Sequence, residues 1–204
     1  MSRGLPLIAL TLFVGVGFVW RSWYQVRRFG SSGIVLFQSG RWAQHLREAA
    51  LLVMVLAIGG QAVAAAVASP TLAASLLWPV GAAGQVCAIA LVLAGTGVMV
   101  LAQLQMGASW RVGIDEGARP GLVRSGLYRL SRNPIYVAML LALLGFVLLL
   151  PTWLSLLTLL ATVVGIRRQV LEEEAYLLRT YGDDFADYAA HVGRFVPGVG
   201  LVDG

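Results

Sequence analysis

The chain has 204 residues, of which 58% are hydrophobic and 12% are charged. Soluble domains carry about 25% charged and about 45–50% apolar residues, so this composition excludes an ordinary soluble domain and indicates an integral membrane protein. A net charge of +5 would suggest nucleic-acid binding in a soluble protein, but here it indicates loops that face anionic membrane lipids, and we expect no nucleic-acid partner.

Three apolar segments in the first half of the chain are long enough to cross a membrane. Residues 5–20 precede Arg21, Arg27 and Arg28, which reverses the charge order of a signal peptide, so a retained first helix is predicted. Residues 49–69 form the second predicted span, which ends near Pro70. The third, residues 81–106, contains small residues that favour close helix packing: Gly84, Ala88, Ala90, Ala94 and Gly95.

Cys87 is the single cysteine of the chain and lies within this third apolar segment. It has no partner for an intramolecular disulfide, and no cluster of cysteine and histidine residues surrounds it in the sequence. A thiolate metal site needs several such ligands at close spacing, so we expect no metal site.

A fourth apolar stretch, residues 135–166, contains no charged residue. As one helix it would extend about 48 Å, whereas the hydrocarbon core of a bilayer is about 30 Å thick. Pro151 lies near its middle, and proline interrupts helices. The stretch is therefore predicted to be a hairpin of two short helices that meet at Pro151 and Thr152; a single kinked helix is the alternative.

Arginines alternate between the segments that connect these spans. Segments 21–47 and 107–134 and the tail after residue 166 are rich in arginine, whereas residues 70–80 and the tip of the hairpin have none. The predicted fold class is therefore all-α, with about five transmembrane helices and a C-terminal helical tail in the cytoplasm. The predicted location is the inner (plasma) membrane, with the N-terminus outside and the functional site on the cytoplasmic side.

The stretch YRLSRNPIY, residues 128–136, precedes the fourth apolar stretch. Asn133 is a favourable N-cap and Pro134 a favourable first helical residue, so the fourth helix is predicted to begin here. Its free N–H groups, together with Arg129 and Arg132, would suit a carboxylate or a phosphate. The alternative is a simple helix cap whose arginines extend to lipid phosphates.

A second cluster, IRRQVLEEEAYLLRTYG, follows the fifth predicted helix. Helical spacing places Arg168, Glu172, Tyr176 and Arg179 along one stripe and Glu173 beside Gln169. Three consecutive glutamates at the end of a membrane helix indicate paired or ligand-binding charges. A solvated face of ion pairs is the alternative.

The tail sequence YGDDFADYAAHVGRFVP predicts a short amphipathic helix. Gly182 can end one helix and Asp183 can cap the next. Phe185, Tyr188, Ala189 and Val192 would then form one apolar face that packs on the membrane or over the site. A purely structural lid is the alternative, and His191 stands alone in the sequence without the companions that a ligand set needs.

Five stretches occur in a fixed order over about residues 106–197: MGASWRVGID, GLVRSGLYRLSRNPIY, LPTWLS, EEAYLLRTYG and DFADYAAHVGRFVP. In this order they resemble the isoprenylcysteine carboxyl methyltransferases and the related phospholipid N-methyltransferases, in their prokaryotic branch. Several spaced motifs are more specific than any one of them. We therefore expect N-terminal transmembrane helices over residues 1–105 and a methyltransferase core over residues 106–204.

The resemblance implies an integral membrane enzyme that uses S-adenosyl-L-methionine, held under the cytoplasmic tail. The positions that match the family's cofactor residues are Gly126, Tyr128, Arg132, Asn133, Pro134, Tyr136, Arg168, Glu173 and Glu174. Those expected to act in catalysis are Arg168, Glu172 and Glu173. A histidine that is frequent in the family is replaced by Asn133, so an amide would replace an imidazole there. A helix N-terminus with arginine suits the cofactor's carboxylate, glutamates suit its ammonium or ribose, and tyrosines suit its adenine.

The methyl acceptor is left open by the sequence. A lipophilic molecule or lipid that enters from the bilayer is expected, and its reactive group is a carboxylate, an amine or a hydroxyl. A carboxylate needs little acid–base help, whereas an amine or a hydroxyl needs a base, for which a tail glutamate is available. Two other hypotheses remain at this point: an NADPH-dependent membrane reductase of the sterol-reductase type, and a membrane scaffold without enzymatic activity.

Overall fold

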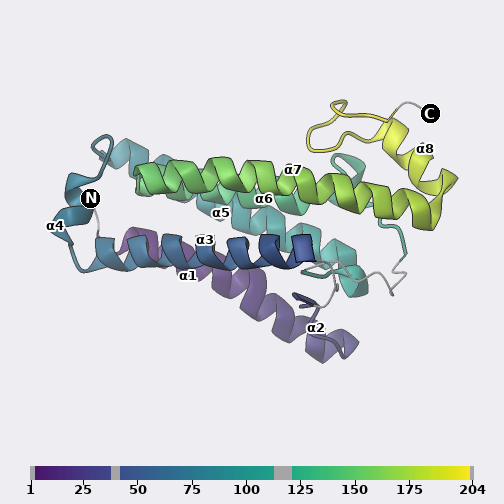
Figure 1. Cartoon of the computed structure of the whole chain (residues 1–204), viewed down its shortest axis with the longest axis horizontal. Helices are drawn as coiled ribbons and strands as arrows, with labels where there is room; N and C mark the ends of the chain where they lie inside the picture. Colours follow the sequence, from purple (N-terminus) through teal and green to yellow (C-terminus); the bar gives the residue numbers. More distant parts are fainter. Residues whose placement is uncertain (1–2, 38–41, 113–120, 203–204) are drawn as a thin grey trace.

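The computed structural model describes residues 3–37, 42–112 and 121–202, and every regular element in these ranges is a helix (Figure 1). In chain order the elements are α1 (Leu5–Val14), η1 (Gly15–Trp20), α2 (Arg21–Phe29), α3 (Trp42–Ala66), α4 (Pro70–Ala74), α5 (Ala82–Met106), η2 (Gly107–Ser109), η3 (Gly126–Arg129), α6 (Pro134–Leu149), α7 (Trp153–Tyr181) and α8 (Asp183–His191). The long helices lie roughly side by side, and the two chain termini lie at opposite ends of the bundle.

Four continuous helical segments in the described ranges are long and apolar enough to cross a membrane. They are Leu5–Phe29, Trp42–Ala66, Ala82–Ser109 and Trp153–Tyr181, and the shorter apolar helix Pro134–Leu149 accompanies them. Between 22% and 33% of each long apolar window is buried inside the protein. Most of their apolar surface therefore faces outward, as it must where lipid is the solvent. The predicted all-α membrane fold with about five spans is confirmed.

The first span is longer than predicted, because the helix does not end with the π-helical turn η1 at Trp20 but continues as α2 to Phe29. Arg21 is fully buried rather than exposed in a loop. Its guanidinium donates to the carbonyls of Gln103 and Gly107, at 3.2 and 2.9 Å, and lies 4.5 Å from the centre of the Trp110 ring. The side chain thereby satisfies carbonyls that the end of α5 leaves without helical partners.

Helices α5 and α6 approach each other closely because small residues line their contact. A Cβ atom on Gly95 would lie 2.7 Å from the carbonyl oxygen of Ala138, and one on Gly145 would lie 2.6 Å from that of Ala88. The predicted close packing is confirmed at Ala88 and Gly95, which are buried. By contrast Gly84, Ala90 and Ala94 are exposed.

The predicted hairpin is confirmed, and the single kinked helix is excluded. Helix α6 ends at Leu149, Pro151 occupies the turn, and α7 begins at Trp153. Only the first arm is short: α6 has 16 residues, whereas α7 has 29 because it continues past the apolar stretch to Tyr181. At the tip, the Thr152 hydroxyl donates to the side-chain carbonyl of Gln61, which anchors the turn to α3.

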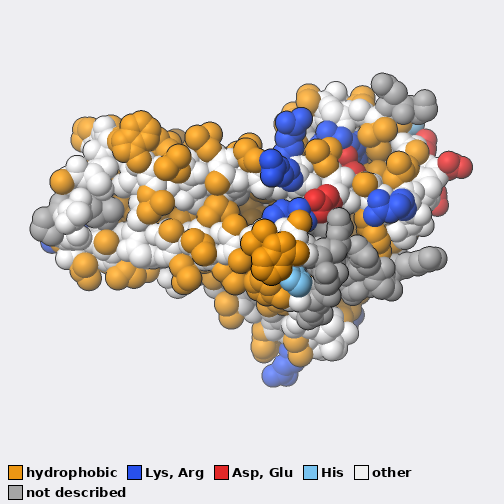
Figure 2. Space-filling model, viewed as in Figure 1, with side chains coloured by type: hydrophobic (Ala, Val, Ile, Leu, Met, Phe, Trp, Pro, Cys, Tyr) orange, Lys and Arg blue, Asp and Glu red, His pale blue; other side chains and the backbone are white. Residues whose placement is uncertain are grey.

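Most charged side chains lie at one end of the molecule. In Figure 2 hydrophobic side chains cover the longer part of the visible face, and acidic and basic side chains gather at the end that carries α8. At the same end lie the beginning of α6, the end of α7 and the C-terminal tail. The polar motifs of residues 128–136 and 167–197 are therefore brought together there.

Candidate functional site

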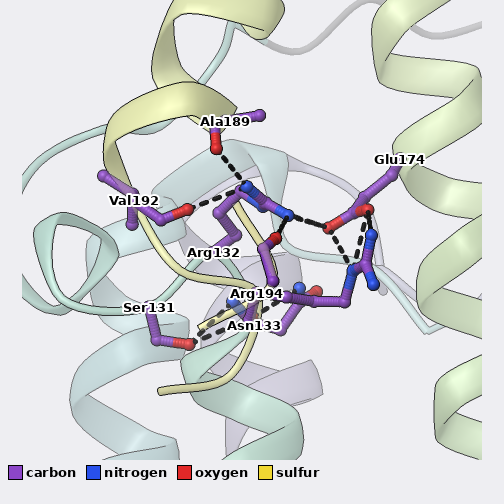
Figure 3. Close-up of polar contacts among 8 residues, drawn as sticks. Ser131, Arg132, Asn133, Glu174, Ala189, Val192 and Arg194 are labelled. Carbon is purple, nitrogen blue, oxygen red and sulfur yellow. Dashed lines mark hydrogen bonds and ion pairs between the residues drawn. The ribbon is translucent and has the colours of Figure 1, made fainter. Parts of the chain in front are cut away.

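Arg132, in the turn before α6, is the centre of a hydrogen-bond network (Figure 3). Its Nη1 donates to the carbonyl oxygens of Ala189 and Val192, at 2.6 and 2.8 Å. Its Nη2 donates to the carbonyl oxygen of Gly200, at 2.8 Å. Through these bonds one side chain, 2% exposed, fixes both the end of α8 and the segment that follows it.

Glu174 of α7 lies between two arginines. One of its oxygens accepts from Nε of Arg132 at 3.0 Å, and both accept from Nε of Arg194 at 3.1 and 3.0 Å. The second nitrogens of both guanidinium groups lie 2.9 and 2.8 Å from the carboxylate. Because the Glu174 side chain is only 11% exposed, this charge is largely desolvated and depends on both partners.

Asn133 occupies the N-cap position of α6, as predicted, but its side chain does not cap the helix. The amide nitrogen instead donates to the carbonyl oxygen of Arg194, at 3.0 Å. Ser131 donates to the same oxygen, at 3.3 Å. The prediction that the Asn133 side chain caps α6 is therefore wrong, because its amide binds the carbonyl oxygen of Arg194 in the tail instead. The start of the helix rests on Pro134 at its first position, which the sequence did predict.

A second polar contact at this end joins Tyr136 of α6 to Glu173 of α7. The tyrosine hydroxyl donates to Oε1 of Glu173 at 2.7 Å, and Gln169 donates its side-chain amide to the same oxygen at 2.9 Å. Both hydrogen bonds are accepted by Oε1, so they orient the carboxylate, and Oε2 takes part in neither of them. The predicted neighbourhood of Glu173 and Gln169 is confirmed.

Among the residues that the structure describes, Glu172 does not pair with an arginine of its own helix, although helical spacing placed it on one stripe with Arg168 and Arg179. It accepts from Nη1 and Nη2 of Arg47 on α3, both at 2.7 Å, in a two-pronged ion pair. Arg168 is exposed on α7, four residues before Glu172. The three predicted catalytic residues thus share one end of α7, where Glu172 contacts Arg47 and Glu173 contacts Tyr136 and Gln169.

Gly126 and Tyr128 support the turn before α6. Gly126 has a left-handed backbone (φ +62°), and the side chain of Gln105 occupies the space where a Cβ atom would lie. Tyr128 is 6% exposed and its hydroxyl donates to the carbonyl of Ala102, whereas its own carbonyl accepts from the hydroxyl of Tyr188 at 2.6 Å. Burial raises the pKa of Tyr128 above its ordinary value and that of Tyr188 to about 12, so both remain neutral donors.

Helix α8 presents the apolar face that the sequence predicts. Phe185, Tyr188 and Ala189 are buried together, with Val192 packed against them. The N-cap is Gly182 rather than Asp183, which is already the first helical residue. A cavity of about 210 Å³ lies between α7 and α8; it is lined mostly by apolar side chains, with Glu174 among them.

Three residues at this end were not predicted to belong to the site: Arg47, Gln169 and Arg194. Gln169 lies four residues before Glu173, so helical spacing already signalled that contact. Arg194 is 20 residues from Glu174 and Arg47 is 125 residues from Glu172. The local sequence does not predict contacts between residues so far apart in the chain.

Comparisons with known proteins show a family and a fold. Residues 83–184 match the family described as phospholipid methyltransferase. A solved structure of the eukaryotic intramembrane Ras methyltransferase ICMT (isoprenylcysteine carboxyl methyltransferase) is similar over 100% of both chains, with a TM-score of 0.50 and 16% identity. At that identity the likeness shows a shared fold. A search among curated proteins finds no match.

Proposed function

Because this chain belongs to the phospholipid methyltransferase family, we propose that it methylates a lipophilic acceptor that reaches the charged end of the bundle from the bilayer. The family's enzymes use S-adenosylmethionine and act on lipid acceptors, and the protein is a multi-pass membrane methyltransferase. Membership of this family favours methyl transfer over the reductase and scaffold hypotheses. The observation that carries the proposal is the Tyr136–Glu173–Gln169 contact beside the Arg132–Glu174–Arg194 network.

The donor and acceptor groups at this end fit the cofactor. S-adenosylmethionine supplies an electrophilic methyl group on a sulfonium. Glu173 offers Oε2 to its ammonium or ribose hydroxyls, and Tyr136 offers an aromatic face. The first-turn N–H groups of α6, at Ile135 and Tyr136, have no acceptor within the helix and suit a carboxylate.

Arg132 has a positioning role in this proposal rather than a direct one. Its donors are directed to Glu174 and to three carbonyl groups, so a cofactor anion would have to compete with all of them. Together with Glu174, Asn133 and Ser131, it holds the tail over the beginning of α6. Gly126, Tyr128 and Pro134 shape the turn that carries these groups.

Glu172, Glu173 and Arg168 remain the proposed catalytic side chains. A carboxylate acceptor would require positioning alone, and an amine or hydroxyl acceptor would give its proton to a glutamate. Glu173 is the better placed of the two glutamates as base, since Arg47 neutralises Glu172. We further propose that this end of the bundle faces the cytoplasm. We also propose that the chain divides into N-terminal transmembrane helices, residues 1–105, and a methyltransferase core, residues 106–204.

Cofactor binding tests the proposal directly. We expect S-adenosylhomocysteine to raise the unfolding temperature of the detergent-purified protein, whereas NADPH leaves it unchanged. Glu173→Gln should weaken S-adenosylhomocysteine binding by about tenfold, since it removes one charge-assisted hydrogen bond. Asp187→Asn, which removes an exposed carboxylate from α8, is the matched control. Protection by NADPH instead would contradict the proposed function.

A further inference from the structure

Arg47 and Glu172 join two membrane-spanning helices, α3 and α7, at the charged end of the bundle. Both nitrogen–oxygen distances are 2.7 Å, and the two side chains are 27% and 31% exposed. The planar guanidinium and the carboxylate face each other in the two-pronged geometry that also binds free carboxylates and phosphates. Glu172 precedes Glu173 on α7, so the pair lies at the same end of α7 as the proposed reaction site.

Polar atoms beside this pair lack partners in the part of the chain that the structure describes. Gln44 is 2% exposed and donates to Glu48 at 2.9 Å, but its Oε1 has no donor. His45 Nε2 and Arg47 Nε are likewise enclosed and without a partner. Such atoms are rare in proteins, because each one costs free energy unless a ligand, water or ion satisfies it. Among them, the Nε–H of Arg47 belongs to the ion pair itself, so the pair keeps one unused donor for an anionic group.

A second cation allows Glu172 to change partners. Arg168 is exposed and lies four residues before Glu172 on α7, a spacing at which side chains on one helix meet. If an external anion takes the place of Glu172 at Arg47, the glutamate therefore need not remain unpaired. Arg47 would then present its two terminal nitrogens and its unused Nε–H to that anion.

We propose that this turn of α3 binds the anionic group of the lipid acceptor, a phosphate or a carboxylate, and that Glu172 occupies its place until the lipid arrives. The inference rests on the proposed function and deepens it, because it makes Arg47 the residue that selects the acceptor. The unpartnered Nε–H of Arg47 supplies a further donor. The selecting residue then lies outside residues 83–184, the part of the chain that matches the family.

Simple amphiphiles test the subsite without any methyl transfer. The dissociation constants of dodecyl phosphate, dodecanoate and dodecanol are measured from their protection of the detergent-purified full-length protein against thermal unfolding. The parent should bind at least one anionic probe and should bind dodecanol more weakly. Arg47→Gln should weaken anionic binding by about tenfold, and Glu172→Gln, which removes the internal competitor, should strengthen it. Arg28→Gln removes an exposed arginine from α2 and should change nothing.

The opposite signs of the two variants separate a binding site from a purely structural ion pair. Preference for the phosphate or for the carboxylate identifies which group the acceptor carries, and either result supports the proposal. Equal binding by Arg47→Gln and the parent, weaker binding by Glu172→Gln, or no protection of the parent would overturn it. S-adenosylhomocysteine binding is measured on the same samples. A parent that binds it but no amphiphile refutes only the subsite, and the reverse result refutes the proposed function.

Discussion

Arg132 decides the position of the tail through four protein partners at once. Its bonds to three carbonyl groups and to Glu174 require the flat, five-donor shape of a guanidinium, which no other side chain has. The carbonyls it binds belong to residues 57 to 68 positions away in the chain. Loss of this one side chain would therefore release the end of α8 and the segment after it together.

We predict that Arg132→Gln lowers the free energy of unfolding by about 3–5 kcal/mol, because it leaves a buried carboxylate with one partner instead of two. Arg124→Gln is the matched control, since it breaks an exposed pair with Asp184 at 3.0 Å and should cost about 0–1 kcal/mol. Thermal unfolding and limited proteolysis of the tail measure both effects. Equal losses in the two variants would show that the Arg132 network does not hold the tail.

Tyr188 should make stability depend on alkaline pH. Burial raises its pKa from 10.0 to about 12, so the folded protein keeps the hydroxyl protonated where the unfolded chain ionises. The stabilisation is complete below pH 10 and is lost as the pH rises toward 12. Tyr188→Phe should flatten the decline of the unfolding temperature over this interval. An unchanged pH profile in the variant would assign the decline to other groups.

Residue pairings were only partly predictable. Helical spacing sufficed for Gln169 and Glu173, and the motifs located Tyr136, Arg132 and Glu174 near one end. The actual partners are 37 residues apart for Tyr136 and Glu173 and 42 for Arg132 and Glu174, which only the folded hairpin and tail bring together. The Asn133 side chain was assigned to its own helix because the competing Arg194 carbonyl is invisible in the local sequence.

At the scale of elements, the α5–α6 contact is the most sensitive to side-chain size. Gly95→Ala should destabilise the protein by about 1–3 kcal/mol, since its Cβ would meet the backbone of α6 at 2.7 Å. Gly97→Ala on the same helix meets nothing within 4 Å and should be neutral or slightly stabilising, because alanine favours helices. Unfolding temperatures of the two variants in one detergent give the comparison. A neutral Gly95→Ala would contradict the close packing of the two helices.

Apolar length, Pro151 and small residues were enough to predict the spans and the hairpin. The boundaries were less predictable, because they depend on tertiary contacts of charged residues. Arg21 was assigned to a loop by its charge, yet it lies inside the first span, where the end of α5 provides carbonyl acceptors. Likewise α7 extends beyond the apolar stretch because Glu172, Glu173 and Glu174 all have partners at the charged end.

For the whole molecule, the arginine distribution predicts that the end with α8 faces the cytoplasm. In a Cys87→Ala background, a cysteine at Ser125 should react with a membrane-impermeant maleimide only after the cells are opened. A cysteine at Thr71, at the opposite end, should react in intact cells. Positions 41, 115 and 203 would also report on topology, but they lie outside the described residues. Labelling of position 125 in intact cells would reverse the orientation.

The function proposed for the protein is methyl transfer to a membrane lipid at the end of the bundle that holds Glu173. Its most direct test is the transfer of a tritiated methyl group from S-adenosylmethionine to lipids extracted from the host membrane, counted in the organic phase. The parent should label a lipid, Glu173→Gln should lower the rate by at least about tenfold, and Asp187→Asn should retain the parental rate. Full labelling by Glu173→Gln, or labelling of no lipid by the folded, cofactor-binding parent, would contradict it.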